Sequence, residues 1–258
     1  MKSISFLAVF FILAMVGFFA CQKDDLGILG PSTLGVKIEA LNKSYSLPIT
    51  GTATKTALAG ATSIEWDSAH FIVSNIKFEA ELKSLVTHRD SIEIIYKWTG
   101  PQMANLLKPD ASFGNFLLQP GIYDEIEITV RGEKKDTGDV PVFYLHGTYT
   151  RSKATLPVEV IVNEDVTLKT EKDSVEIKEE SIAVTSYIQL YLDELIKKID
   201  PADLDNSKLT NGVIVISKDS NRDIYYTIFH NLAKDRPCYY EHKYKKYIKD
   251  KKNKGDDD

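Results

Sequence analysis

The sequence predicts a mainly β protein, an antiparallel β-sandwich with a short α-containing part near the C-terminus. Three observations indicate this fold. Apolar and polar residues alternate in many short runs from Val36 onward, one of them being Ile92, Ile94, Tyr96 and Trp98. A period of two is typical of strands that bury one face and expose the other, as antiparallel strands do. Turn residues such as Pro120-Gly121 separate the runs, and helical spacing is confined to a few short segments.

The predicted strands follow one another at short intervals. They cover residues 64–66, 69–82, 92–98, 116–119, 122–130, 143–149, 157–162, 166–170, 175–177 and 182–192. Many short strands at this spacing are typical of a sandwich or a barrel. Further along, Asn211-Gly212 predicts a tight turn into one more buried strand, 213–216.

Three segments predict helices. Residues 101–107 predict one short turn of helix with Pro101 at its start, a position that proline favours. Residues 193–199 predict a second, which ends before Pro201. The clearest helix follows Ser220, which stands three residues before Asp223 as in a capping box. Its apolar residues recur at helical spacing and predict one buried face: Ile224, Tyr225, Ile228, Phe229 and Leu232.

The N-terminus has the order of a secretory signal. Lys2 supplies positive charge, an apolar run follows, and Ala20 stands directly before Cys21. A small residue, then a cysteine, then charge resembles the signal of a bacterial lipoprotein. The resemblance implies that residues 1–20 are a cleaved signal peptide and that Cys21 becomes the lipidated first residue. Two alternatives stay open. The apolar run is close to the ~20 residues that span a bilayer, so it could be an uncleaved anchor. It could also be an ordinary secretory signal that is cut elsewhere.

The residues after the cysteine extend this resemblance. Cys21-Gln22-Lys23-Asp24-Asp25 resembles the export signal of Bacteroidota lipoproteins, in which a lysine and two acids follow the lipidated cysteine. In that family the signal implies transport to the outer membrane, with the protein facing the cell exterior. A bacterial lipoprotein normally carries three acyl chains, and two or more chains anchor stably. The resemblance therefore implies that the protein contacts its membrane through lipid.

Composition divides the mature chain into four parts. Residues 21–35 hold Gly, Pro, Ser and Asp and predict a tether, and residues 36–200 are the predicted sandwich domain. A polar stretch marks a boundary, after which residues 201–240 predict a C-terminal β-α extension. Residues 241–258 are a charged tail that is rich in lysine and tyrosine and closes on three aspartates. Such a tail either binds an anionic surface or polymer or is a solvated terminus.

Charge and cysteine content narrow the range of functions that we expect for the chain. The chain has 32 Lys and Arg against 37 Asp and Glu, and this mild acidity argues against nucleic acid as a partner. With Cys21 lipidated, Cys238 is the one cysteine left and cannot form an intramolecular disulfide. A catalytic role for Cys238 would need a base beside it. An unpaired thiol is the simpler interpretation.

The motifs of several enzyme classes are absent from the sequence. It has no phosphate-binding Gly-Lys-Ser/Thr loop, no His-Glu-x-x-His, no Gly-x-Ser-x-Gly and no Cys-x-x-Cys. We therefore expect no cofactor and favour a non-catalytic protein. An enzyme stays open, because glycosidases need only two carboxylates from anywhere in the fold.

Two groups of residues are candidate ligand sites. Asp219, Asn221 and Asp223 alternate oxygen-bearing side chains as calcium loops do, although Ile224 takes the place of the usual glycine. Residues of these types also simply form turns and helix caps. Trp66 and Trp98 could form an aromatic platform for sugar rings. Their phase with neighbouring apolar residues equally predicts a place in the core.

The body also resembles the small β-rich lipoproteins of unknown function in Bacteroidota. The similar stretches run over residues 66–76 and 117–126, and the second contains a Pro-Gly-x-Tyr step before an alternating strand. This step is structural and implies no catalytic residue. The expected function is non-catalytic binding of a glycan or an envelope protein at the cell surface. A hydrolase of envelope polymers and a fimbrial-type structural subunit are the alternatives.

Overall fold

The computed structural model describes residues 32–47, 62–83, 91–134, 140–151, 154–178, 181–233 and 238–246. Residues from Pro31 onward form one compact unit. The predicted signal peptide and the residues Cys21, Lys23, Asp24 and Asp25 lie outside the described residues.

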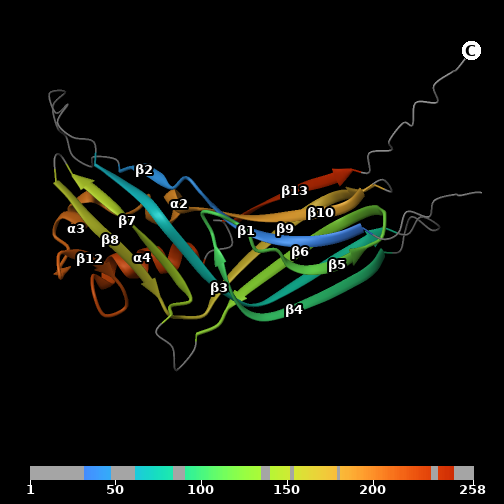
Figure 1. Cartoon of the computed structure of the whole chain (residues 1–258), viewed down its shortest axis with the longest axis horizontal. Helices are drawn as coiled ribbons and strands as arrows, with labels where there is room; N and C mark the ends of the chain where they lie inside the picture. The colour runs from blue at the N-terminus through green and yellow to red at the C-terminus, as the bar shows by residue number, and fades with distance from the viewer. Residues whose placement is uncertain are drawn as a thin grey trace, which may run out of the picture. The chain divides into compact units, whose positions relative to one another are not determined.

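The chain is mainly β, as predicted, and its strands form two sheets (Figure 1). The four-stranded sheet has the order β13-β10-β1-β5 and consists of β1 (Ser32–Leu41), β5 (Phe113–Leu118), β10 (Ser181–Tyr191) and β13 (Cys238–Lys246). The nine-stranded sheet follows the path β11-β12-β8-β7-β3-β6-β9, with β2 and β4 also paired to β3. Its strands are β2 (Ser44–Ser46), β3 (Ser63–Lys83), β4 (Ser91–Asn105), β6 (Gly121–Gly132), β7 (Phe143–Arg151), β8 (Ala154–Val162), β9 (Val166–Ile177), β11 (Leu209–Thr210) and β12 (Val213–Ile216).

Most neighbouring strands are antiparallel, with two exceptions. Strand β1 runs parallel to β10, and β12 runs parallel to β8. Through β12, part of the segment 201–240 belongs to the nine-stranded sheet. Residues 241–246, at the start of the predicted tail, lie in β13 and pair with β10.

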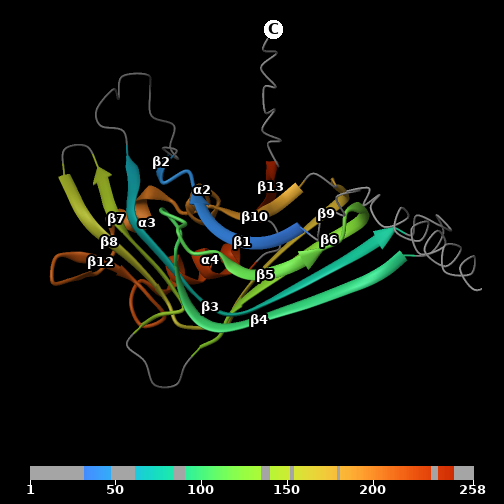
Figure 2. The ribbon, with the colours of Figure 1, turned by 45° about the vertical axis from the view of Figure 1, so that its right-hand side comes forward.

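Strand β3 is 21 residues long and has different neighbours along its length. Residues 63–71 pair with β7, and residues 75–82 pair with β6. Strand β4 pairs with one edge of β3, and β6 and β7 pair with the other edge, one after the other along the strand. Strands β6 and β7 therefore diverge from each other where they leave β3. Register shifts occur between Trp66 and Ser68 and between Val73 and Asn75, and such bulges bend and twist a strand. Figure 2 shows this bend of β3 and β4.

A glycine allows β7 to approach the first of these bulges. Gly147 is in register with Trp66. A Cβ atom on Gly147 would lie 2.2 Å from the carbonyl oxygen of Glu65, closer than real Cβ contacts allow. The pairing of β3 with β7 therefore requires a residue without a side chain at this position.

The two sheets meet through aromatic side chains. Phe116 of β5 stacks on Phe78 of β3 and on Tyr96 of β4, at centroid distances of 5.7 and 5.4 Å. Phe113 of β5 makes an edge contact with Trp98 of β4 at 5.1 Å. Since β5 belongs to one sheet and β3 and β4 to the other, these pairs join the inner faces of the sandwich.

The described helices are α2 (Leu192–Ile196), α3 (Pro201–Asp205) and α4 (Arg222–Leu232). Helices α2 and α4 confirm two of the three predicted helices, with shifted ends. The turn at Asn211-Gly212 is also confirmed, since both residues have positive φ, 52° and 83°. Among the described residues, none of the helices has the length and hydropathy needed to cross a membrane.

The predicted helix at 101–107 is wrong, because β4 continues to Asn105 and pairs with β3. Pro101 lies at the register shift opposite Val73 and Asn75, where a strand tolerates a residue without an N–H.

The predicted capping box at the start of α4 is also wrong. Asn221 is the N-cap, with a φ of 52° and no side-chain capping bond, and Ser220 forms a β-bridge with Ser217.

Candidate functional site

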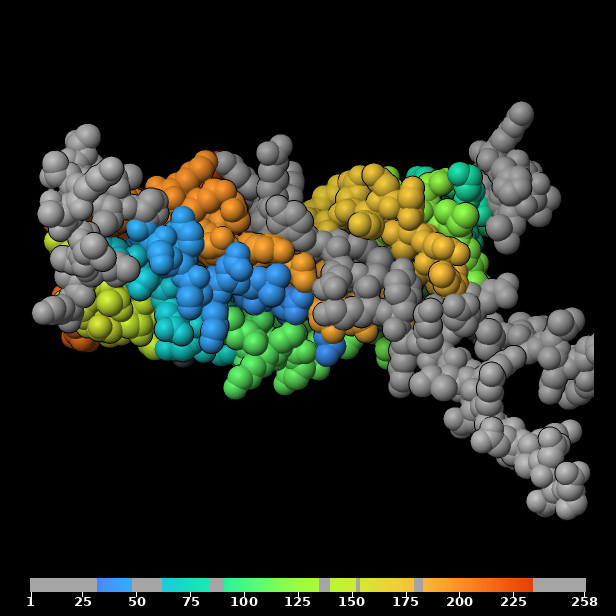
Figure 3. All heavy atoms as spheres, turned by 90° about the horizontal axis from the view of Figure 1, so that it is seen from above, coloured from blue at the N-terminus to red at the C-terminus, as the bar shows by residue number. Residues whose placement is uncertain are grey.

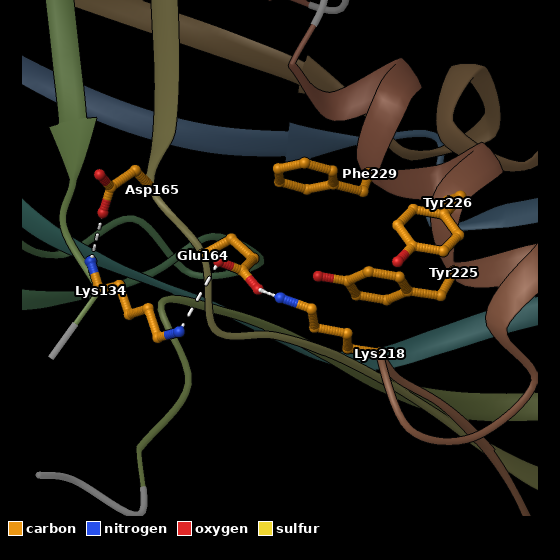
Figure 4. Close-up of a pocket in the computed structure, with 7 residues that line it drawn as sticks. All are labelled: Lys134, Glu164, Asp165, Lys218, Tyr225, Tyr226 and Phe229. Carbon is orange, nitrogen blue, oxygen red and sulfur yellow. Dashed lines mark hydrogen bonds and ion pairs between the residues drawn. The ribbon is translucent and has the colours of Figure 1, made fainter. Parts of the chain in front are cut away.

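A cavity of about 360 Å³ lies between α4, the turn that joins β8 to β9, and the segment that follows β6 (Figure 4). It is lined by Lys134, Glu164, Asp165, Lys218, Tyr225, Tyr226 and Phe229. Lys134 follows β6, the two acids belong to the β8–β9 turn, and Lys218 lies between β12 and α4. We call this cavity the α4 pocket.

One wall of the α4 pocket is aromatic. Tyr225 and Phe229, one helical turn apart on α4, stack with a centroid distance of 5.9 Å and an angle of 2° between their rings. Tyr226 makes an edge contact with Tyr225 at 5.4 Å and is 44% exposed. The Arg222 guanidinium lies 5.7 Å from the Tyr226 ring centroid and donates a hydrogen bond of 3.2 Å to its hydroxyl. Tyr226 is thus held in place while it stays open to solvent.

The opposite wall is made of ion pairs centred on Glu164. Its Oε1 lies 2.5 Å from Lys218 Nζ, and its Oε2 lies 3.8 Å from Lys134 Nζ. The hydrogen bond to Glu164 raises the pKa of Lys218. The backbone N–H of Lys134 donates to Asp165 Oδ1 at 2.8 Å. Two cations and two anions therefore line this wall.

The hydroxyl of Tyr225 is the unusual group in the α4 pocket. Tyr225 is 1% exposed, and its hydroxyl has no hydrogen-bond partner among the described residues. Figure 4 shows the hydroxyl pointing toward the pair of Glu164 and Lys218. Burial, with a smaller contribution from the charge of Glu164, raises the pKa of Tyr225. A buried polar group without a partner costs about 1–3 kcal/mol, so a ligand that hydrogen-bonds it would recover part of that cost.

These groups suit the binding of a polar ring. A sugar presents a flat apolar face that can pack on Tyr226 and hydroxyls that can bond to the carboxylates, to the lysines and to Tyr225. Both oxygens of Glu164 already face lysines, an arrangement that holds the carboxylate in position. The α4 pocket therefore presents a carboxylate of fixed position, beside two lysines, to a bound ligand.

The two tryptophans that the sequence singles out lie elsewhere. Trp66 is 1% exposed and belongs to the hydrophobic core, so it offers no surface to a ligand in this structure. Trp98 is half-buried and packs against Phe113. Neither of them lines the α4 pocket.

The candidate calcium ligands are Asp219, Asn221 and Asp223. Of these three, Asn221 has a structural role. Its Nδ2 donates to the carbonyl oxygens of Lys208 and Val215, and its Oδ1 accepts from the N–H of Lys208. These bonds hold the turn that carries Lys218 and starts α4. One lone pair of the Asn221 side-chain oxygen is thus used within the turn.

The outer face of the nine-stranded sheet is strongly acidic. The register aligns four acids in one row across β4, β3, β6 and β9: Glu93, Glu81, Glu125 and Asp173. The next row holds Ile95, Glu79, Glu127 and Glu171, and the one after it holds Lys97, Lys77, Thr129 and Lys169. We call the first two rows the acidic face. Lysines pair with two of its acids, Lys77 with Glu79 at 2.5 Å and Lys169 with Glu127 at 2.8 Å.

Repulsion on the acidic face acts most clearly on Glu125. Its pKa is raised, chiefly by the charge of Glu171, then by desolvation and by Glu81, Glu127 and Asp173. Among the described residues, Glu125, Glu127 and Glu171 are also the group whose oxygens approach closely enough to share a metal ion. Exposed acids commonly cluster without one, and the cluster by itself defines no site.

We predict that Glu125→Gln stabilises the protein at neutral pH. A carboxyl whose pKa is raised by folding favours the folded state at low pH and opposes it once both states are ionised. The gain should therefore disappear as the pH falls below the ordinary range of a glutamate, and it should shrink in high salt. Urea unfolding at several pH values measures this. The control Glu65→Gln, an exposed acid of β3 outside the acidic face, should show no such gain, and equal gains from both variants would contradict the prediction.

Sequence reasoning did not identify the α4 pocket, because its residues come from four separate segments. The one signal of the pocket in the sequence was the helical spacing of Tyr225 and Phe229, which also fits a core-facing helix.

Comparison with protein-family models, with curated proteins and with solved structures finds no match to this chain. The α4 pocket is therefore described from its own geometry.

Proposed function

We propose that the protein is an outer-membrane surface lipoprotein, anchored through Cys21, whose body binds a glycan in the α4 pocket without catalysis. The order of residues around Cys21 supports the anchor, and Lys23, Asp24 and Asp25 support the outward-facing location. Glycan binding is supported by an exposed ring, Tyr226, that faces a wall of hydrogen-bonding and charged side chains.

The unpartnered hydroxyl of Tyr225 is the observation that carries the glycan proposal. A buried hydroxyl without a partner at the wall of a cavity can be satisfied by a polar group of whatever occupies that cavity. Glycan hydroxyls both donate and accept, and they can bridge Tyr225 to the neighbouring Glu164 and Lys218. An envelope protein that inserts a polar side chain here is the competing occupant, and the absence of glycan binding would favour it.

We predict that the chain without its signal peptide binds an oligosaccharide on a glycan array and that Tyr226→Ala weakens this binding about tenfold. Loss of one ring contact costs ~1 kcal/mol or slightly more, and 1.4 kcal/mol corresponds to a factor of ten. Tyr225→Phe should also weaken binding, while the free energy of unfolding stays the same or rises because an unsatisfied hydroxyl has been removed. Calorimetry with the best array ligand measures both effects.

The matched control is Met103→Ala, which removes another exposed apolar side chain, 56% exposed, from β4. It should bind the glycan as the unmodified protein does. Failure of the unmodified protein to bind any glycan, or an equal loss in Met103→Ala, would refute the glycan proposal. Release of cleaved sugar from the bound glycan would instead identify a hydrolase.

We predict that Cys21→Ser leaves the protein unprocessed or releases it from membranes, because the thiol is the site of lipid attachment. Fractionation of cells that express the variant, with detection of acyl-chain labelling, measures this. Cys238→Ser is the control and should remain lipidated and membrane-bound. Normal cleavage together with unchanged anchoring of Cys21→Ser would rule out the lipid anchor.

A further inference from the structure

Strand β4 is a long free edge of the nine-stranded sheet. Among the described residues, its 15 residues pair with β3 alone, whereas β3 is paired along both of its edges. Figures 1 and 2 show β4 along the lower margin of the molecule, and Figure 3 shows β1 in blue and β10 in orange on the side seen from above. Natural proteins shorten or cover most such edges, because the unpaired N–H and C=O groups recruit another strand. The free backbone of β4 is therefore suited to pairing with one more strand.

The first part of β4, residues 91–99, combines this free backbone with exposed apolar side chains. Its pairing with β3 contains no register shift from Ser91 to Thr99. Ile92 is 57% exposed and Ile95 is 46% exposed. The two lie on opposite faces of the sheet, because side chains alternate along a strand. We call residues 91–99 the β4 edge. A long, regular and partly apolar edge of this kind is typical of a strand that associates with another chain.

Two charged side chains of the β4 edge have a like charge beside them. In the register with β3, Glu93 lies beside Glu81, and Lys97 lies beside Lys77. Like charges directly opposite each other destabilise a sheet. Glu93 and Lys97 are both exposed, and neither forms an ion pair with another described residue. An opposite charge on the free side of β4 would therefore stabilise each of them.

The β4 edge is complementary to a second copy of itself. When two copies pair antiparallel about a twofold axis at Ile95, Glu93 of each copy lies beside Lys97 of the other. Side chains directly opposite in such a pair have Cβ atoms ~5 Å apart, close enough for an ion pair. A shift of the axis by one residue would place Glu93 beside Ile95 or Thr99 and leave both charges unpaired. Charge complementarity therefore selects one register.

The same axis matches the charged rows of the outer face. We call the row of Lys97, Lys77, Thr129 and Lys169 the lysine row. The acidic row that begins at Glu93 continues into the lysine row of the second copy, and the reverse holds on the other side of the axis. Between them Ile95 meets Ile95, and the two Glu79 side chains stay about 14 Å apart across three strand spacings. Salt screens repulsion over that distance.

The inner face of the β4 edge matches as well. The axis places a β-branched side chain beside an aromatic one in two kinds of pair, Ile94 with Tyr96 and Ile92 with Trp98. Pairs of this type stabilise neighbouring strands. Trp98 is half-buried and Ile92 is exposed, so both have surface left to bury.

We propose that two copies of the chain form a dimer in which their β4 edges pair antiparallel about Ile95. The pairing joins two nine-stranded sheets into one continuous sheet, with both outer faces on the same side. The inference goes beyond the proposed glycan binding and does not depend on it, because no residue that lines the α4 pocket lies in the β4 edge.

The test measures the oligomeric state of the chain from residue 22, which retains the whole compact unit. Sedimentation velocity at increasing concentration should show a monomer that becomes a dimer. Lys97→Glu creates repulsion at two symmetric positions of the interface and should raise the dimer dissociation constant at least about tenfold. Glu93→Lys should do the same. The combined variant has opposite charges in register again and should recover the dimer.

The matched control is Lys172→Glu, which makes the same change of charge at an exposed position of β9, at the opposite edge of the same sheet. It should dimerise as the unmodified chain does, and circular dichroism should show that all variants are folded. A monomer at every concentration, an equal loss in the control, or no recovery in the combined variant would overturn the proposal.

Cysteine cross-linking tests the register independently. In a Cys238→Ser background, Ile95→Cys should give a covalent dimer with a short bis-maleimide reagent, because position 95 faces itself ~5 Å away across the axis. Thr99→Cys should give none, because Thr99 lies beside Ser91 and the two thiols would be about 26 Å apart. A covalent dimer through Thr99→Cys, or none through Ile95→Cys, would contradict this register.

Discussion

The backbone pairing of β3 is the constraint on which the rest of the structure depends. Its first half is hydrogen-bonded to β7 and its second half to β6, both on the same side, while β4 runs along the other side. Buried side chains from both halves, such as Trp66 and Phe78, belong to one continuous core. A break in β3 would separate β7, β8 and β12 from β4, β6 and β9. The sandwich is therefore one unit because a single strand is shared by both parts of its larger sheet.

The α4 pocket follows from this divergence of β6 and β7. Strand β8 pairs with β7 and β9 pairs with β6, so the short β8–β9 turn that carries Glu164 and Asp165 crosses from one part of the sheet to the other. Helix α4 supplies the aromatic wall, and Asn231 fixes it through a buried hydrogen bond of 3.0 Å to the carbonyl oxygen of Leu195 in α2. At its other end, Asn221 ties the start of α4 to Lys208 and Val215. Asn221 thus positions both the start of the aromatic wall and the turn that carries Lys218, whereas the β8–β9 turn positions Glu164 and Asp165.

Local patterns in the sequence predict most strands, because each strand's alternation reports directly which side faces the core. They also predict α4 from its spacing and the Asn211-Gly212 turn from residues that accept positive φ. They fail where tertiary pairing overrides a local signal. Pro101 suggests a helix start but lies at a bulge of β4, and Ser220 suggests a cap but bridges to Ser217. Local patterns could not predict the α4 pocket for the same reason, since Lys134 and Tyr225 line one cavity only when distant segments pack together.

Whether β3 joins the two parts of the nine-stranded sheet into one cooperative unit can be measured with the protein's own tryptophans. Trp66 is in register with Gly147 in the β7 part, and Trp98 is in register with Ile76 in the β6 part. Trp98→Phe leaves a reporter of the first part, and Trp66→Phe leaves a reporter of the second. In each variant, urea unfolding followed by fluorescence and by far-ultraviolet circular dichroism should give coincident transitions. A fluorescence midpoint clearly separated from the circular-dichroism midpoint, in either variant, would show that the two parts unfold independently and would contradict the claim.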